Sequence, residues 1–429
     1  MAAPDVPTTD AERALAALFE TRAPGFGSAP LDATRADAFA RFAEAGLPHR
    51  RVEAYRYTDL KRRLRTLPPA AAEAADADVA AALDANPPLA DGSARVVIAN
   101  GRFIPARSAV PQGMRVASLL SPDAETERVG SLVAGTDDPL TLANIALFDG
   151  GVVLHVDGKV ETPVEIVHII TADALVMARA AVVVAPGAEA SIVERTIGGG
   201  GVVTNSLAEF FVAGGARLSV VRIADGLAEE TTLLSTHHAE LGESAVLEHL
   251  SVATGKGLSR AQTFCRIVGD DADANFRAAT VALDGRHADN TLVMHHDALG
   301  SRSSEVFRSA VGTGGIAIVQ GRIIVDPGAQ KTDAKMMSNA LFLDDTGEVV
   351  NKPELEIFAD DVICGHGATS GDIDEDPVFY LRARGIPEAT ARRLLTEAFI
   401  IEALDLVADE ALNDALAERI RTALAAVVA

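Results

Sequence analysis

Cys364 and His366, a cysteine and a histidine two residues apart, have the most evident chemical potential in this chain of 429 residues. Residues two apart on a β-strand point to the same face, so a thiol and an imidazole would lie side by side there. Both groups are ligands for iron, zinc or copper. Gly365 and Gly367 let the backbone bend and approach another surface. The pair predicts a metal-binding or reactive site, against the alternative that a lone cysteine is usually a small core residue.

The number of cysteines limits this chemistry. Cys265 is the second of only two cysteines in the sequence. Two cysteines cannot form a disulfide framework in a chain of this size. They also exclude a metal cluster held by four thiolates of one chain. Reduced thiols are typical of the cytoplasm, which is the compartment that we expect.

Other histidines form adjacent pairs, His237-His238 and His295-His296, with His249 and His287 as single residues. Adjacent residues on a strand point to opposite faces, so neither pair can chelate one metal in the usual way. We interpret these histidines as single packed or surface residues. Strands stacked in register could still bring some of them together.

The segment 253–259, ATGKGLS, superficially resembles a phosphate-binding loop. It lacks the first glycine of the GxxxxGK[ST] pattern, and Gly257 stands where serine or threonine belongs. We therefore expect no nucleotide to bind to this chain.

Composition excludes several classes of function. The formal charge is −23, and such a field repels nucleic acid and anionic membranes. No apolar run reaches the roughly 18 residues of a membrane span. The N-terminal stretch lacks the basic and apolar regions of a signal peptide, which also favours a cytoplasmic protein.

From residue 150 to about 345 the sequence alternates short Val-, Ile- and Thr-rich runs with glycine turns, a pattern typical of strands. Four glycines align at intervals of 28, 27 and 27 residues, and a further pair differs by 28: Gly187, Gly215, Gly242 and Gly269, then Gly300 and Gly328. A fixed period in this range indicates a stacked array, and no long helix fits between neighbouring strands. The sequence predicts a parallel β-helix whose inward side chains stack into a long apolar core.

Helical patterns flank the repeat. Ala11–Arg22, behind the capping candidate Asp10, and Asp32–Ala45 have apolar residues at helical spacing, and helices return after Gly371. We predict a mainly β protein with an N-terminal helical domain and linker at 1–93, a β-helix core at 94–371 and a C-terminal helical domain at 372–429. The segment 50–65 carries seven basic side chains, which indicate either a solvated face or a contact with an acidic partner.

Two C-terminal stretches resemble a known family. They read GRIIVDPGAQKTDAKMMSNALFL from Gly321 and NKPELEIFADDVICGHGATSGDIDEDPVFYLRARGI from Asn351. They are similar to the SufB/SufD family of the SUF iron–sulfur cluster assembly scaffold, over about 70 residues. The two cysteines and the HGAT sequence match the D-type members (SufD) better than the B-type. Overall length and the segment Tyr55–Thr58 agree with this resemblance.

The resemblance implies a β-helix flanked by helices, which agrees with the repeat. It also implies a complex with a SufB-type subunit through the β-helix and with SufC-type ATPases on the C-terminal helices, with a possible homodimer when the chain is alone. By position, Cys364 and His366 match family residues near the seam between subunits, where an iron–sulfur cluster is thought to be built. The residues Tyr380, Leu381, Arg384 and Gly385 match the segment leading into the helices that dock the ATPase.

We therefore expect a non-enzymatic scaffold subunit for iron–sulfur cluster assembly and transfer, with a transient cluster shared with its partner. Cys364 and His366 are the candidate cluster residues, and no catalytic residue is assigned. Two alternatives are a β-helix enzyme acting on polysaccharide and an architectural subunit with no ligand role. The first would require secretion and an aromatic-lined groove, which this sequence does not indicate.

Overall fold

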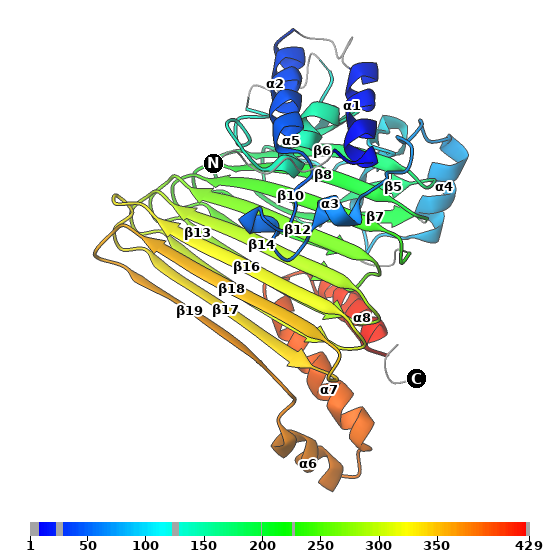
Figure 1. Cartoon of the computed structure of the whole chain (residues 1–429). Coiled ribbons are helices and arrows are strands. Elements are labelled where there is room, and N and C mark those ends of the chain that lie inside the picture. Colours follow the sequence, from blue (N-terminus) through cyan, green and yellow to red (C-terminus); the bar gives the residue numbers. More distant parts are fainter. Residues whose placement is uncertain (1–7, 23–28, 122–127, 199, 225–227, 426–429) are drawn as a thin grey trace.

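Strands of about ten residues dominate the chain because branched and apolar side chains alternate with turn residues throughout its middle. The structure, a computed structural model, describes residues 8–22, 29–121, 128–198, 200–224 and 228–425. In these residues the strands wind into a parallel solenoid of about seven turns. Two large sheets face each other along its length, and helices lie outside them (Figure 1).

The chain passes from one sheet to the other in each turn, so alternate strands belong to the same sheet. We call them sheet A and sheet B. Sheet A contains β3 (Met114–Ser118), β4 (Gly151–Val156), β6 (Leu175–Val184), β8 (Val203–Val212), β10 (Thr232–Leu241), β12 (Leu258–Ile267), β14 (His287–His296), β16 (Ile316–Val325) and β18 (Glu348–Ile357). Sheet B contains β1 (Ala94–Ala99), β2 (Arg102–Phe103), β5 (Val164–Ile170), β7 (Glu189–Gly198), β9 (Arg217–Ala224), β11 (Val246–Ala253), β13 (Asp273–Ala282), β15 (Arg302–Val311), β17 (Asp333–Phe342) and β19 (Ile363–Gly371).

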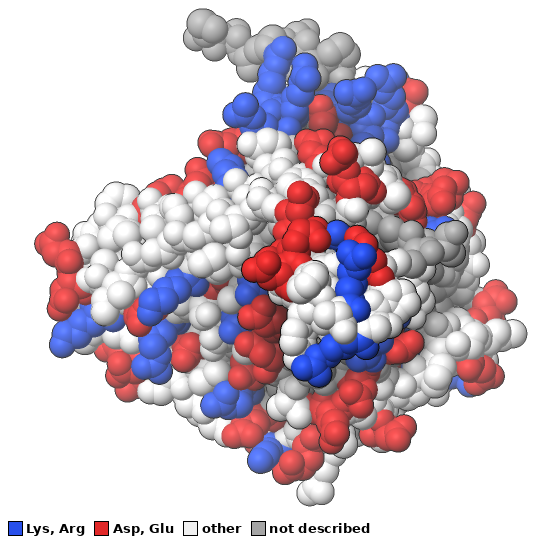
Figure 2. All heavy atoms as spheres, turned by 90° about the horizontal axis from the view of Figure 1, so that it is seen from below, with Lys and Arg blue, Asp and Glu red and all other residues white. Residues whose placement is uncertain are grey.

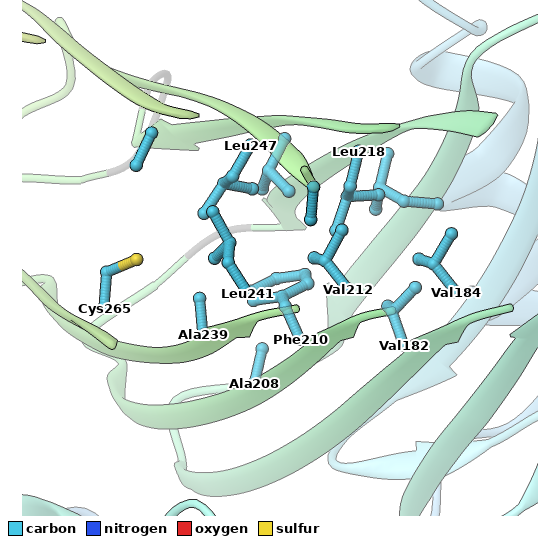
Figure 3. Close-up of a cluster of buried hydrophobic side chains, with 14 of the residues drawn as sticks. Val182, Val184, Ala208, Phe210, Val212, Leu218, Ala239, Leu241, Leu247 and Cys265 are labelled. Carbon is cyan, nitrogen blue, oxygen red and sulfur yellow. The ribbon is translucent and has the colours of Figure 1, made fainter. Parts of the chain in front are cut away.

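Neighbouring strands pair in register, so equivalent residues of successive turns form rows along the solenoid. Ala239 of β10 pairs with Cys265 of β12, which pairs with Met294 of β14. All three are buried and belong to one apolar cluster between the sheets. Figure 3 shows Cys265 beside Ala239 at one edge of the drawn part of this cluster, with Leu241 of sheet A and Leu247 of sheet B pointing into the space between the sheets. Burial of this cluster stabilises the fold, because about 25 cal/mol is gained per Å² of apolar surface removed from water.

The aligned glycines lie in the tight turns that lead from sheet A to sheet B, as the period predicts. Their structural roles differ. Gly215 has a φ of +66°, which favours glycine. Gly269 does not, and its turn places Asp271 in the left-handed region instead. A side chain at Gly269 would meet the backbone nitrogen of Glu243 in the preceding turn at 1.9 Å. Stacking of turns, rather than φ, requires glycine there.

Most of the N-terminal region covers the outer face of sheet A, whereas residues 76–85 pack on sheet B. Leu15 and Phe42 pack in one cluster with sheet residues Met177 and Leu207. Tyr55 is buried, and the guanidinium of Arg260 lies 4.1 Å from its ring centre. The helices of this region are α1 (Asp10–Arg22), α2 (Ala29–Ala45), η1 (Glu53–Tyr55), α3 (Leu60–Arg63), α4 (Asp76–Ala85), η2 (Pro105–Arg107) and α5 (Pro139–Leu147).

The C-terminal region covers the outer face of sheet B. Ile400 and Leu416 are fully buried against Val221 and Leu250 of that sheet. These helices are α6 (Glu375–Ala383), α7 (Glu388–Ile401), η3 (Glu402–Leu404) and α8 (Glu410–Ala425). Figure 1 shows α7 and α8 beside the solenoid and α6 beyond it.

The fold class predicted from the sequence is therefore confirmed: a mainly β solenoid with helices at both ends of the chain. The domain limits at residues 93 and 371 stay a prediction. In the described residues, no helix is long and apolar enough to cross a lipid bilayer.

Candidate functional site at the end of the solenoid

Cys364 and His366 lie on β19, the last strand of sheet B. In the register, Cys364 pairs with Ala334 and His366 pairs with Met336 of β17. Ala334 is fully buried and Met336 is 2% exposed, and both belong to the cluster between the sheets. Since residues of one row point to the same side, the thiol and the imidazole both face the interior of the solenoid. The structure therefore brings them to one face of one strand.

This end of the solenoid is open. Within the described residues, β19 pairs only with β17 and β18 pairs only with β16. Cys364 is half-buried and packs against the cluster between the sheets, while His366 is exposed. Unpaired strand edges are templates for pairing with another chain. Two metal-binding side chains thus lie at a surface where a second solenoid could continue the stack.

The Cys364 thiol is in its neutral form at neutral pH. Burial raises its pKa above the ordinary value, the nearby acids Asp333 and Glu305 raise it further, and a hydrogen bond with the backbone of Ala334 opposes them. A thiolate would therefore form on binding a metal ion, which displaces the thiol proton. Among the described residues, no three histidine, cysteine or acidic side chains are arranged to hold a metal ion. Any complete ligand set needs further groups or a rearrangement.

Apolar side chains surround this open end. Ile363 is 66% exposed and Phe358 is 60% exposed, and Met337 and Ile357 are partly exposed beside them. No atom lies within 4 Å of the space that a side chain at Gly365 would fill. Figure 2, viewed from below, shows acidic and basic side chains interspersed with uncharged surface, so the net charge of −23 does not form one acidic field on that face. The residues at the open end fit contact with another protein.

The residues Tyr380, Leu381, Arg384 and Gly385 lie on and just after α6. The carboxylate of Asp374 caps this helix, and Gly385, with a φ of +86°, follows its end. The Tyr380 ring is exposed, with the Arg384 guanidinium 4.5 Å from the ring centre. Phe379 is 73% exposed next to it. An ion pair of 2.7 Å between Glu375 and Arg392 connects α6 to α7. This helix offers aromatic side chains to solvent at a distance from the Cys364 site.

A chain of buried polar residues inside the solenoid was not predicted from the sequence. Glu194 of β7 contacts His168 at 2.8 Å and His237 at 2.6 Å, and His237 lies 2.9 Å from His249. Burial alone would raise the pKa of Glu194, but the two histidines bonded to it hold it well below the usual range. His237 and His238 do point to opposite faces, as expected. Strands stacked in register were expected to be able to bring some histidines together, but the sequence alone could not pair His237 of sheet A with His249 of sheet B.

Two models of known protein families match most of this chain. The family model for the SUF system FeS cluster assembly, SufBD core domain, matches residues 168–399, and that for the SufBD protein N-terminal region matches residues 12–166. An iron–sulfur cluster assembly SufBD family protein of Mycobacterium leprae is 34% identical over 208 residues, which cover 47% of this chain and 53% of that protein. The iron–sulfur cluster assembly protein SufD of Escherichia coli is 31% identical over 245 residues, 55% of this chain and 56% of that protein.

A SufBD family protein of Synechocystis is 28% identical over 389 residues, and the match covers 84% of each chain. The match with the Mycobacterium leprae and Escherichia coli proteins spans only about half of their length. The core-domain match includes Cys364, His366 and the whole of α6, whereas α8 lies outside it.

Proposed function

Because the chain belongs to the SufBD family of the SUF system of iron–sulfur cluster assembly, we propose that it acts as a scaffold subunit without an enzymatic reaction of its own. A role in iron–sulfur cluster assembly follows from the family. In the proposal, Cys364 and His366 supply ligands or sulfur-handling groups at a seam with a second solenoid subunit. The cluster is held there transiently and then passes to an apo-protein.

One observation carries the proposal: two soft-metal ligands share a face at the open end of a solenoid. Cys364 and His366 provide two ligand atoms, whereas iron–sulfur clusters usually have four protein ligands. The deeper cysteine, Cys265, is 2% exposed and lies on a different strand of the other sheet. Ligands from a partner's edge can complete the set without rebuilding this core. These residues therefore fit best a cluster site whose ligands come from two subunits.

The proposed partner at the seam is a SufB-type subunit. The exposed edges of β18 and β19 can continue into the strands of a second solenoid, so that main-chain hydrogen bonds join the two subunits. Ile363 and Phe358 would then be buried between them. When that partner is absent, the same surface can pair with a second copy of this chain.

The proposed partner at α6 and α7 is a SufC-type ATPase. Tyr380 and Leu381 lie on one short helix and Arg384 directly follows it, and exposed aromatic side chains are frequent binding hot spots. ATP would be hydrolysed by that partner, in agreement with the rejected phosphate loop at residues 253–259. Movement of the ATPases would rearrange the seam and uncover the cluster. In this scheme residues 1–93 brace the solenoid, residues 94–371 build the seam and residues 372–429 dock the ATPase, all in the cytoplasm.

Co-expression with a SufB-type and a SufC-type partner tests this function. The complexes are purified without oxygen, and iron and sulfide are measured for the wild type, Cys364→Ser and His366→Ala. Ser370→Ala, an exposed position on the same strand, is the matched control. We expect all complexes to form and only the first two variants to lose cluster. Equal cluster content in all four proteins would mean that this chain is architectural and that its partner holds the cluster.

A further inference from the structure

The carboxyl group of Glu305 is buried without a partner two strands away from His366. Glu305 lies on β15, its side chain is 0% exposed, and among the described residues neither of its carboxyl oxygens has a hydrogen-bond partner. The Ser303 hydroxyl is near enough to favour the charged form but bonds instead to His296, at 3.0 Å. Buried polar groups are nearly always paired, so an unpaired carboxyl in a native core requires an explanation.

Register places Glu305 directly beneath the candidate site. Glu305 pairs with Met336, and Met336 pairs with His366, so the three residues form one inward row across β15, β17 and β19. The adjacent row contains Ser303, Ala334 and Cys364. Neighbouring strands are about 4.8 Å apart. An ion midway between Glu305 and His366 would therefore lie about 5 Å from β15 and about 5 Å from β19.

Two features would let an ion pass from the open end of the solenoid to Glu305. Ala334 is the only side chain between Cys364 and Ser303 in their row, and it is small. Met336 fills the other row with a flexible thioether that packs against the backbone of Gly321, where a side chain would meet its sulfur at 2.3 Å. A thioether is itself a soft metal ligand. Glu305 is also close enough to Cys364 and to Cys265 that its ionised form raises the pKa of both thiols.

We propose that Glu305 is a carboxylate ligand for iron(II) that enters the open end of the solenoid past Cys364 and His366, and that the side chains rearrange around the ion so that this chain alone supplies three ligands. The proposal rests on the proposed function and adds to it a loading step before the cluster is built. Burial without a partner keeps the carboxyl neutral, with a pKa raised to about 8. A bound cation supplies the missing partner, and carboxylate, imidazole and thiolate together suit iron(II).

Anaerobic titration of the purified full-length chain with iron(II), read by competition with a chromogenic chelator, tests the site. Wild type, Glu305→Gln and Cys364→Ser are compared with Glu348→Gln, which changes an exposed carboxyl on β18. We expect one iron(II) per wild-type and control chain and at least tenfold weaker binding in the other two. Cobalt(II) serves as a second probe, whose thiolate absorption reports the Cys364 bond separately. Glu305→Leu keeps the test valid should Glu305→Gln fold poorly, because an apolar side chain suits this core.

The outcomes separate this inference from the proposed function. Glu305→Gln binding iron(II) as tightly as wild type would overturn the inference, as would a wild-type chain that takes up none. Loss in Glu305→Gln without loss in Cys364→Ser would also contradict the shared site. None of these results changes the cluster content expected in the three-protein complex, which is decided by the Cys364 and His366 variants there.

Discussion

The Nδ1 atom of His237 lies 2.9 Å from the Nε2 atom of His249, although the two histidines come from opposite sheets. The other ring nitrogen of His237 contacts the Glu194 carboxylate at 2.6 Å. One side chain therefore connects sheet A to two strands of sheet B inside a largely apolar core. His238, the next residue, points outward and stacks on Phe264.

This relationship predicts that His237→Phe and His238→Phe differ strongly in stability. The first removes one of the two histidines bonded to the buried Glu194 charge, together with the ring that contacts His249, so we expect the free energy of unfolding to fall by about 3 kcal/mol. The second keeps the stacking on Phe264 and removes a ring whose Nε2 has no partner among the described residues. It should change stability by less than about 1 kcal/mol. Urea unfolding followed by circular dichroism measures both, and equal losses would contradict the internal link.

Stability should fall on mild acidification. Burial lowers the pKa of His238, His287 and His296 to about 4, with neighbouring arginines or His295 acting in the same direction. The unfolded chain takes up protons below about pH 6.5, whereas the folded chain does not until about pH 4. Stability is therefore complete above about pH 7 and is lost as the pH falls through that interval.

At pH 5.5 each of these histidines should lower the free energy of unfolding by about 1 kcal/mol relative to pH 7.5. Urea midpoints at the two pH values measure the difference. In His238→Phe the loss of unfolding free energy on acidification should be smaller by about 1 kcal/mol. An unchanged pH dependence in that variant would contradict the assignment.

Stacked turns predict that Gly269→Ala is more harmful than Gly187→Ala. The added methyl at position 269 meets the backbone of the preceding turn, so the two turns must move apart. At Gly187 nothing lies within 4 Å, and only the φ of +70° opposes alanine, at a cost of about 1–2 kcal/mol. Thermal unfolding of the two variants decides this, and similar melting temperatures would show that the turns are loosely stacked.

These glycines also show how far sequence reasoning reaches. The period located six of the turns that lead from sheet A to sheet B. Asn100 and Gly101 are a typical two-residue hairpin turn, and both have positive φ between β1 and β2. Local patterns of this kind act through backbone conformation within a few residues. The cap of α1 was wrong by one residue: Thr9, not Asp10, bonds reciprocally with Glu12.

Partners across the solenoid could not be predicted because they depend on which face of each strand turns inward. The spacing of Cys364 and His366 predicted their common face, since both lie on one strand. Nothing in the sequence distinguished Glu305 from the other acidic residues, which total 61. Its relation to the candidate site depends on the strand register, which places it in one row with His366. Rows between strands about 30 residues apart become visible only in the folded chain.

At α6, Tyr380→Ala should weaken binding of a SufC-type ATPase without altering the fold. The ring is 56% exposed, so its removal should leave stability within about 0.5 kcal/mol of wild type. Loss of an aromatic hot spot costs at least about 2 kcal/mol of binding, roughly thirtyfold in affinity. Val268→Ala, an exposed apolar residue in a distant turn, is the control for calorimetric titration. Unchanged affinity would place the docking surface elsewhere.

At the open end, Ile363→Lys should prevent pairing with a SufB-type subunit, because a lysine would be buried against the partner without a counter-ion. Leu299→Lys makes the same change at an exposed turn residue, 46% exposed against 66% for Ile363, and should pair normally. Light scattering coupled to size-exclusion chromatography of the co-expressed chains measures this. The chain alone adds a second arm: a self-complementary edge predicts a concentration-dependent dimer. If Ile363→Lys abolishes both the dimer and the mixed complex, the two assemblies share one surface; if it abolishes neither, the strand edges next to Cys364 are not the seam.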